Sequence, residues 1–492
     1  MHASVTPGAA KEFEIRTNKA IDDVGRRKGI QDAMRYLQKK RIEQFKDSRE
    51  LDELRSVCES IRQYSLANLP RLLEQLETKL TSHGVNVHWA ETPAEANAIV
   101  LSIAKKKSFG HIVKGKSMVS EEIGLNHALE KAGIEVVETD MGEYIVQLAG
   151  ETPSHIIMPA IHKSKQEIGR LFSENIPGAE YTEDVDELIR IARGFLRKKF
   201  EKAEIGISGV NFAVAETGTL CLVENEGNGR MCTTVPSVHI AVTGIEKVVE
   251  KLEHVAPLYS ALTKSATGQA VSTYLNLISG PRKPEELDGP EEVHLILVDN
   301  GRTNAYINNS LRKTLQCIRC GACMNHCPVY ARIGGHGYGT TYPGPIGAII
   351  SPHLLGLKKT YSIVSASTLC GACAEVCPVR IPITDQLIAL RHQAVSISHK
   401  DELAVPGAGE ARKPLTAAIW RAWQAVYMTP ALYRFVTWLS AHIPTSLLSY
   451  QGGWTASRVP LLPKRKRFRD WLKSVPGNIK TTNARRVAKN SN

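Results

Sequence analysis

The cysteine residues between positions 317 and 377 carry the strongest chemical signal in this sequence. The first motif, Cys317-Ile-Arg-Cys320-Gly-Ala-Cys323-Met-Asn-His-Cys327-Pro328, has the C-x2-C-x2-C-x3-C-P spacing typical of a [4Fe–4S] site. Three thiolates two residues apart can surround one iron–sulfur cube, while the fourth, held away by the turn before proline, reaches a second cluster. The second motif, Cys370-Gly-Ala-Cys373-Ala-Glu-Val-Cys377-Pro378, repeats the last three cysteine positions of the first.

This repetition predicts two iron–sulfur clusters with crossed ligands. The expected assignment is Cys317, Cys320, Cys323 and Cys377 for cluster 1, and Cys327, Cys370 and Cys373 for cluster 2. Ser367 occupies the position of the missing fourth cysteine of cluster 2. Three outcomes stay open: a [4Fe–4S] cluster with a non-cysteine fourth ligand, a [3Fe–4S] cluster, or a cysteine from elsewhere, such as Cys221 or Cys232. Structural zinc is the alternative to both clusters, but a four-ligand zinc site fits seven cysteines poorly.

A second motif, Gly110 to Ser117, matches the G-x4-G-K-[ST] pattern of a phosphate-binding loop letter for letter. Leu295 to Asp299 resembles the strand that accompanies such a loop in nucleotide hydrolases. Such a loop needs a strand before it and a helix directly after it. Here Ile112–Lys114 is itself the expected strand, and Ser120–Lys131 is the expected helix, so the sequence does not favour a nucleotide site. No G-x-G-x-x-G dinucleotide motif occurs in the sequence.

Residues 85–300 alternate between short β-rich runs and helical runs. The expected strands are Val85–Trp89, Ile134–Thr139, His155–Pro159, Val210–Ala215, Thr219–Asn225, His239–Thr243 and Val293–Val298. The expected helices include Ala94–Lys105, Ser120–Lys131, Ser164–Phe172 and Val185–Glu201. This alternation predicts an α/β domain with a mostly parallel sheet. Val210–Ala215 and Thr219–Asn225 flank Glu216-Thr217-Gly218, so we expect an antiparallel hairpin there.

Polar side chains collect near the ends of the expected strands. They are Lys116, Glu121, Glu122, Asn126, Glu138, Asp140, Glu143, Asn211, Glu216, Thr217, Glu224, Asn225, Glu226 and Arg230. Ligands in open α/β sheets bind at the carboxyl ends of the strands, so these residues are candidates for binding. Many of them would serve equally as helix caps or turn residues. No catalytic residue can be assigned from the sequence.

The length of 492 residues suggests about three domains. We expect an N-terminal helical segment (1–80), the α/β domain (81–304), a ferredoxin-type helical domain with the cysteine motifs (305–395) and a helical C-terminal region (396–492). In the N-terminal segment, Leu51, Leu54, Cys58 and Ile61 recur at helical spacing, so Cys58 is expected to be buried rather than a ligand. Hydrophobic content of 42% and charged content of 23% argue against disorder.

The positive charge is concentrated at the C-terminus. Residues 461–492 contain ten Lys and Arg and one Asp, whereas the whole chain has a net charge of +12. The Lys464-Arg465-Lys466-Arg467 run could contact an anionic membrane surface or an acidic partner, or remain solvated; no motif supports nucleic acid. The five tryptophans between 415 and 475 fit either an amphipathic surface or a small helical cap. Without a signal peptide or a transmembrane stretch, a cytoplasmic location is expected, with membrane association left open.

Taken together, the motifs resemble the iron–sulfur lactate-utilisation protein B family, over nearly the whole chain. The resemblance rests on Lys116–Ile123, Glu138–Tyr144, Ala215–Leu220, Asn225–Arg230, Pro343–Ala348 and both cysteine motifs. It implies a CoA-transferase- or isomerase-like α/β domain called LUD (lactate utilisation), then a ferredoxin-type module and a helical C-terminal region. It also implies two [4Fe–4S] clusters on the seven cysteines named above. The expected partners are a second cysteine-rich lactate-utilisation protein and a separate LUD-domain protein.

Three functional hypotheses follow from these observations. The first is an electron-carrier subunit of a multi-protein system that oxidises L-lactate to pyruvate. The second is a self-contained oxidoreductase that binds a hydroxy acid in its α/β domain. The third is a redox-sensing binding protein.

Overall fold

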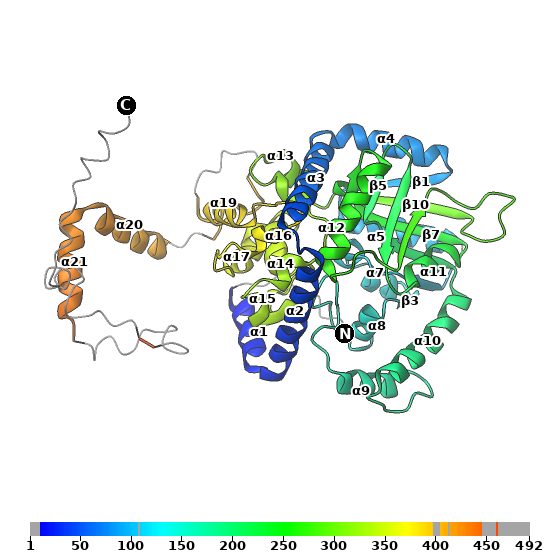
Figure 1. The fold of residues 1–492 in the computed structure, drawn as a ribbon, viewed down its shortest axis with the longest axis horizontal. Helices are drawn as coiled ribbons and strands as arrows, with labels where there is room; N and C mark the ends of the chain where they lie inside the picture. Colours follow the sequence, from blue (N-terminus) through cyan, green and yellow to red (C-terminus); the bar gives the residue numbers. More distant parts are fainter. Residues whose placement is uncertain (1–9, 107–108, 397–403, 412–413, 445–458, 461–492) are drawn as a thin grey trace. The chain divides into compact units, whose positions relative to one another are not determined.

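The computed structural model describes residues 10–106, 109–396, 404–411, 414–444 and 459–460. The chain divides into two compact units, Met1–Ala411 and Arg412–Asn492, which we call the main unit and the C-terminal unit. In Figure 1, the main unit runs from the blue N-terminal helices to the yellow helices of the cysteine-rich region.

A six-stranded, wholly parallel sheet forms the centre of the main unit. Its order is β1 (Val85–Ala90), β10 (Glu292–Val298), β7 (Val238–Gly244), β4 (Ile205–Gly209), β2 (His111–Lys114) and β3 (Glu135–Glu138). The central strands β7 and β10 are buried on both faces, which explains their nearly continuous runs of aliphatic residues. The predicted α/β class with a mostly parallel sheet is therefore confirmed.

Helices cover one face of this sheet, and a second sheet with a helix covers the other. On the first face, α5 (Pro93–Lys106), α6 (Met118–Glu122) and α7 (Leu125–Lys131) pack on the aliphatic side chains of the strands. On the second face, α4 (Leu69–Ser82) packs together with a four-stranded sheet. That sheet has the order β8 (Val248–Val249), β5 (Phe212–Val214), β6 (Thr219–Glu224) and β9 (Tyr274–Ile278). The predicted antiparallel hairpin is confirmed as β5 and β6.

The N-terminal helices connect the α/β domain to the cysteine-rich module. α1 (Ala10–Asp22) and α2 (Val24–Gln44) contact α15 of that module, and α3 (Ser48–Ala67) contacts α12 of the α/β domain. In the predicted apolar stripe, Cys58 is fully enclosed and Ile61 is buried, whereas Leu51 and Leu54 are half-buried. The module consists of η3 (Arg312–Gln316), α14 (Ala322–Asn325), α15 (Tyr330–Tyr338), α16 (Gly344–Leu355), α17 (Leu357–Ser365), α18 (Ala372–Glu375) and α19 (Ile383–Val395). The remaining elements of the main unit are α8 (Met141–Leu148), α9 (Lys165–Asn175), α10 (Val185–Lys202), α11 (Asn228–Thr234), η1 (Ile245–Lys247), η2 (Leu252–His254), α12 (Val255–Ala266) and α13 (Arg302–Ile307).

One predicted strand, His155–Pro159, is wrong. The Nδ1 atom of His155 accepts hydrogen bonds from the backbone N–H groups of Ile157 (3.0 Å) and Met158 (3.2 Å), which turns the chain instead of extending it. The N–H of Ser154 closes the same loop by donating to the carbonyl of Pro159. The expected helix Ser120–Lys131 is two helices, because the chain turns at Gly124 with a φ of 66°.

Two helices make up most of the described part of the C-terminal unit, as the sequence predicts. α20 (Pro414–Met428) and α21 (Pro430–His442) contact each other, and the ring of Trp423 stacks on that of Tyr427. Among the described residues, no helix is long and apolar enough to cross a membrane. The basic run at 464–467, Trp454 and Trp471 lie outside the described residues.

A buried group of charged side chains ties the α/β domain to the cysteine-rich module, and we call it the Arg302 network. The Arg302 guanidinium donates to both Glu122 carboxylate oxygens at 2.8 Å and to Glu246 at 2.6 Å. From the module, Arg319 approaches Glu246 at 3.3 Å, and the Tyr342 hydroxyl donates to Glu122 at 2.6 Å. Burial opposes ionisation of Glu246, but Arg302 and Arg319 outweigh it and hold the pKa of this carboxyl at about 2.

Replacing Arg302 should therefore destabilise the main unit strongly. Arg302→Met leaves two buried carboxylates without their shared cation, and we expect the free energy of unfolding to fall by about 3–5 kcal/mol in anaerobic urea denaturation. Arg190→Met is the matched control, because Arg190 forms an exposed pair with Glu187. The control should change stability by less than about 1 kcal/mol. Equal effects of the two substitutions would contradict the role assigned to the Arg302 network.

Candidate functional site

Four of the predicted ligand cysteines line one small cavity of the main unit. Cys317, Cys320, Cys323 and Cys377 share this cavity with Ile156, Arg319 and several aliphatic side chains. Cys317, Cys320 and Cys377 are buried, and Cys323 is half-buried. We call these four the inner group. Cys377, the last cysteine of the second motif, thus lies with three cysteines of the first motif. This is the crossed arrangement expected from the spacing.

The other three predicted cysteines also lie together, and we call them the outer group. The thiolate charge of Cys327 raises the pKa of Cys373, and the thiolate charge of Cys370 raises the pKa of both Cys327 and Cys373. Cys327 and Cys373 are buried, whereas Cys370 is exposed. Ser367 lies close by in sequence, and its hydroxyl oxygen accepts a hydrogen bond from the N–H of Leu369 at 3.1 Å. The outer group therefore includes an exposed cysteine, while the inner group consists of three buried cysteines and one half-buried cysteine.

The same backbone turn presents the cysteines in both motifs. Arg319 and Gly321 flank Cys320 with φ values of 61° and 74°, and Leu369 and Gly371 flank Cys370 with φ values of 54° and 85°. Two left-handed residues around one cysteine turn the chain tightly, and the glycine adopts that conformation without steric cost. Backbone N–H groups then point at sulfur, for example Arg319 N–H at Cys317 Sγ (3.3 Å).

The electrostatics of the inner group favour a cationic centre among the four sulfurs. Burial, reinforced by the neighbouring thiolates, raises the pKa of Cys320 to about 12, and burial raises that of Cys377 to about 11. Four thiolates at this depth are stable only when they share positive charge, because a buried unpaired anion is costly. Iron bound by sulfur supplies that charge, so the donor set, the cavity and the N–H groups fit an iron–sulfur cluster.

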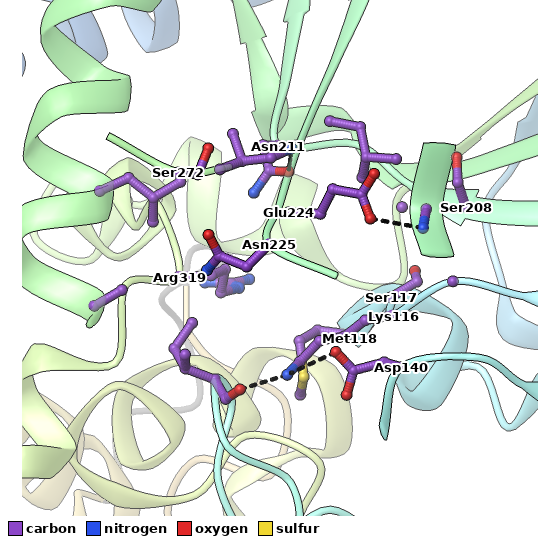
Figure 2. Close-up of a pocket in the computed structure, with 18 of the residues that line it drawn as sticks. Lys116, Ser117, Met118, Asp140, Ser208, Asn211, Glu224, Asn225, Ser272 and Arg319 are labelled. Carbon is purple, nitrogen blue, oxygen red and sulfur yellow. Dashed lines mark hydrogen bonds and ion pairs between the residues drawn. The ribbon is translucent and has the colours of Figure 1, made fainter. Parts of the chain in front are cut away.

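A second and larger cavity, of about 290 Å³, lies at the carboxyl ends of β2, β3, β4 and β7. Six polar residues predicted from the strand ends line it: Lys116, Asp140, Asn211, Glu224, Asn225 and Glu226. Figure 2 shows the labelled side chains arranged around this open space, with Asn211 facing Lys116 across it. Ile156 and Arg319 line this cavity and the cavity of the inner group alike, so the two cavities are neighbours.

Several other candidates from the strand ends form ion pairs and hydrogen bonds in the protein interior instead of lining the large cavity. The Lys114 ammonium, which no sequence motif marks, pairs with Glu138 at 2.7 Å and with Glu121 at 2.9 Å in the protein interior. Glu143 is buried beside them, and Asn126 donates to Glu138. Glu122 belongs to the Arg302 network. These carboxylates do not line the large cavity.

Sequence reasoning missed two cations of the large cavity, Lys247 and Arg319. Lys247 lies in η1, and burial together with repulsion by Arg319 lowers its pKa to about 7. Arg319 lies inside the first cysteine motif, between Cys317 and Cys320. This position is the feature of the sequence that could have identified it as a site residue. Nothing in the sequence around Lys247 distinguishes it from other lysines.

The phosphate-loop pattern at Gly110 to Ser117 does not form a phosphate-binding loop. β2 occupies its middle, and residues 112–114 pair with β3 and β4 in the sheet. Their N–H groups are therefore engaged in the sheet rather than directed at a ligand, as the sequence predicts. Asp299, after β10, accepts hydrogen bonds from the N–H and hydroxyl groups of Thr303 at the start of α13.

The two alternative cysteines lie in the α/β domain. Cys221 is buried in β6, and Cys232 is buried in α11, where its sulfur contacts the Thr139 hydroxyl at 3.5 Å. Burial raises the pKa of both thiols to about 12.

Comparison with known families divides the chain in the same order. Residues 73–298 match the LUD domain, residues 313–381 match a 4Fe-4S dicluster domain, and residues 389–475 match the C-terminal domain of lactate utilisation protein B. The dicluster match includes all seven motif cysteines. Iron–sulfur binding by this module is thereby supported independently of the cysteine geometry.

Relatives extend the similarity over nearly the whole chain. Lactate utilization protein B of Bacillus licheniformis is 41% identical over 94% of this chain and 96% of its own. Lactate utilization protein B of Bacillus subtilis is 42% identical over 94% of this chain and 95% of its own. A protein of Escherichia coli described as an electron transport protein is 46% identical over 78% of this chain and 80% of its own.

The wall of the large cavity predicts a pH dependence of stability. His239 in β7 lies 2.8 Å from the hydroxyl of Ser208, which lines the cavity, and burial, with some repulsion from His294, lowers the pKa of His239 to about 4. The unfolded chain takes up a proton at His239 below about pH 6.5, but the folded protein does not. Stability is therefore lost as pH falls, and going from pH 7.5 to 5.5 should cost about 1.4 kcal/mol through His239.

Urea unfolding at the two pH values should show a loss that is about 1.4 kcal/mol smaller for His239→Gln than for the natural protein, because the buried histidines His155 and His353, whose pKa values are also lowered to about 4, remain in both. His127→Gln, at an exposed position of α7, is the control and should leave the pH dependence unchanged. An identical pH dependence in His239→Gln and the natural protein would show that His239 is not held neutral by burial.

Proposed function

Because the chain belongs to the lactate utilization protein B family, we propose that it is an iron–sulfur electron-transfer protein of an L-lactate oxidation system. The observation that carries this proposal is the assembly of seven cysteines into two groups within the dicluster module. Two clusters in one module serve electron transfer, since each accepts and releases single electrons. The names of the relatives supply the metabolic context.

In this proposal, the inner group holds cluster 1 with Cys317, Cys320, Cys323 and Cys377. The outer group holds cluster 2 with Cys327, Cys370 and Cys373. Ser367 occupies the position of the eighth ligand, so cluster 2 is either a [4Fe–4S] cluster with a non-cysteine ligand or a [3Fe–4S] cluster. The side chains of this module hold the clusters, and backbone N–H groups such as that of Arg319 stabilise the sulfurs.

The difference in exposure sets the expected order of the relay. The inner group is buried beside the large cavity, whereas Cys370 of the outer group is exposed. Electrons from a donor on the α/β side would therefore reach cluster 1 first and leave from cluster 2. The natural acceptor on that exposed face is a partner protein, and a second cysteine-rich lactate-utilisation protein or a separate LUD-domain protein fits this role.

Iron and sulfide analysis of the anaerobically purified chain, combined with EPR, tests the two-cluster assignment. About eight iron atoms with signals only after reduction would indicate two [4Fe–4S] clusters. About seven iron atoms with a signal in the oxidised state would indicate that cluster 2 is [3Fe–4S]. Cys320→Ser should remove the cluster 1 signal and Cys373→Ser the cluster 2 signal, each lowering the iron content by about half.

Cys58→Ala is the matched control, since Cys58 is a buried thiol of α3 outside both groups. It should retain the iron content of the natural protein. Zinc without sulfide in the purified chain would end the electron-transfer proposal. Loss of both signals on replacing only Cys373 would contradict the division into two independent sites.

The large cavity favours a second candidate function. A site for a hydroxy acid next to the inner group would make the chain a self-contained oxidoreductase rather than a carrier alone. Oxidation of L-lactate by the isolated chain with an artificial electron acceptor separates the two candidates. A pure carrier would show no such activity until its partner proteins are added.

A further inference from the structure

Exposed apolar side chains gather on the first helix of the C-terminal unit. In α20, Leu415, Ile419, Trp423 and Tyr427 recur every four residues and therefore share one face of the helix. All four are exposed, and the neighbouring Trp420 is 60% exposed. Contiguous apolar surface of this kind marks a contact with another protein or with a membrane.

The second helix of the unit repeats this pattern. The exposed apolar side chains of α21 are Leu432, Phe435, Val436, Trp438 and Leu439. They recur at spacings of three and four residues, so they form a second apolar stripe. Within α20 and α21, Ala441 is the only buried residue, so both stripes are open to solvent.

Aromatic rings join the two helices. The ring of Trp420 meets that of Trp423 edge-on, with 5.6 Å between the centroids, and Trp423 stacks on Tyr427 at 4.2 Å. Tyr427 in turn meets Tyr433 of α21 edge-on at 5.4 Å. These contacts order the aromatic surface without burying it. Tryptophan and tyrosine are enriched at membrane interfaces, because each combines an apolar ring with a polar N–H or O–H group.

Charge distinguishes this unit from the rest of the chain. Residues 412–492 contain fifteen Lys and Arg and one acidic residue, Asp470, which gives a net charge of +14. The whole chain carries +12, so residues 1–411 carry −2. Neither α20 nor α21 contains an Asp or Glu. Apolar helix faces combined with many cations are typical of segments that bind anionic lipid surfaces.

The length of the two helices determines how they can meet a bilayer. α20 has 15 residues and α21 has 13, whereas crossing the hydrocarbon core takes about 20. Arg421 lies two residues from both Ile419 and Trp423, which places it about 200° around the helix from each of them. Such a helix lies in the plane of the interface, with its apolar face toward the acyl chains and its cation toward the water.

Other occupants of this surface fit less well. A second copy of the chain would bring the same +14 unit and would be repelled. An acidic protein would attract the cations, but it would not by that charge cover two apolar stripes. A bilayer with anionic headgroups offers negative charge and an apolar layer in one surface.

We propose that the C-terminal unit binds the surface of an anionic phospholipid bilayer. The apolar stripes of α20 and α21 lie at the boundary between headgroups and acyl chains, and the cations of the unit supply the attraction to the lipid phosphates. This inference goes beyond the proposed electron-transfer function and does not depend on it.

Co-sedimentation of the full-length, anaerobically purified protein with vesicles tests the proposal. The vesicles are phosphatidylcholine alone and an equal mixture of phosphatidylcholine and phosphatidylglycerol. We expect at least about tenfold tighter binding to the mixture, because each cation near an anionic surface contributes about fivefold to the binding constant. Raising the NaCl concentration from about 0.1 M to about 0.5 M should weaken this binding. Equal binding to both kinds of vesicle, or binding to neither, would overturn the proposal.

A double substitution tests the apolar contact. Trp423→Ser combined with Trp438→Ser removes one ring from each stripe and should weaken binding to the mixed vesicles by at least about tenfold. Trp89→Ser is the matched control, because Trp89 is 45% exposed in β1 of the main unit. It should bind as the natural protein does. Unchanged binding by the double variant would show that charge alone attaches the protein and would overturn the role of the helix faces.

The cations of the described helices are tested in the same assay. Arg421→Gln and Arg434→Gln should each weaken binding to the mixed vesicles by about fivefold. Lys358→Gln, at an exposed lysine paired with Glu410, is the control and should leave the binding unchanged. An equal effect of all three substitutions would contradict a contact made by α20 and α21.

Sedimentation velocity and iron analysis complete the test. A dimer that the double tryptophan variant abolishes, in a protein that binds no vesicles, would assign the stripes to a second copy and overturn the proposal. All variants should keep the iron content of the natural protein, because the cysteine motifs lie outside this unit. Intact clusters without vesicle binding refute this inference alone, and vesicle binding without clusters refutes the electron-transfer function alone.

Discussion

The buried carboxylate of Glu246 is the interaction on which the architecture of the main unit depends. It is fully enclosed, and it is ionised only because Arg302 of the α/β domain and Arg319 of the cysteine-rich module both face it. A buried charge that loses its partner is strongly destabilising, so neither half can separate from the other without exposing or stranding a charge. The hydrophobic core also continues without interruption from the N-terminal helices into the module. The module that holds the cysteines is therefore positioned rigidly against the sheet.

The same region carries more buried positive than negative charge. Arg62, Lys247, Arg302 and Arg319 are all buried, and in the part of the chain that the structure describes the carboxylates paired with this group are Glu122 and Glu246. Arg62 has carbonyl oxygens as its partners, including those of Val248 and Leu315, which satisfy its hydrogen bonds but supply no full negative charge. A site with this imbalance gains stability from an anion, and a cluster bound by four thiolates carries net negative charge. The charges around the inner cysteines thus favour an anionic group, such as an iron–sulfur cluster bound by thiolates, at that position.

The sequence predicts those features of the structure that depend on residues close together in the chain. The motif cysteines follow spacings of two and three residues and a shared backbone turn, so the two groups in which they lie can be predicted from the order of residues alone. The aliphatic runs of β7 and β10 and the glycine turn of the hairpin are local as well. His155–Pro159 has strand-like residues, yet the imidazole of His155 bonds the backbone two and three residues ahead, which no propensity describes. The cavity could be predicted only in part: the strand-end residues Asn211 and Glu224 were identifiable, but Lys247 becomes a cavity cation only through long-range packing.

The two cysteine groups differ in their exposure to solvent. Solvent stabilises charge, so a cluster near the surface exchanges electrons with a partner at little electrostatic cost, whereas a buried cluster is insulated from every group except its immediate neighbours. At the inner group, those neighbours are Arg319 and Ile156, which also form the wall of the large cavity. At the outer group, Cys370 is open to solvent. The inner cysteines therefore adjoin the large cavity, whereas the outer group presents an exposed cysteine, and the proposed order of electron transfer rests on this difference.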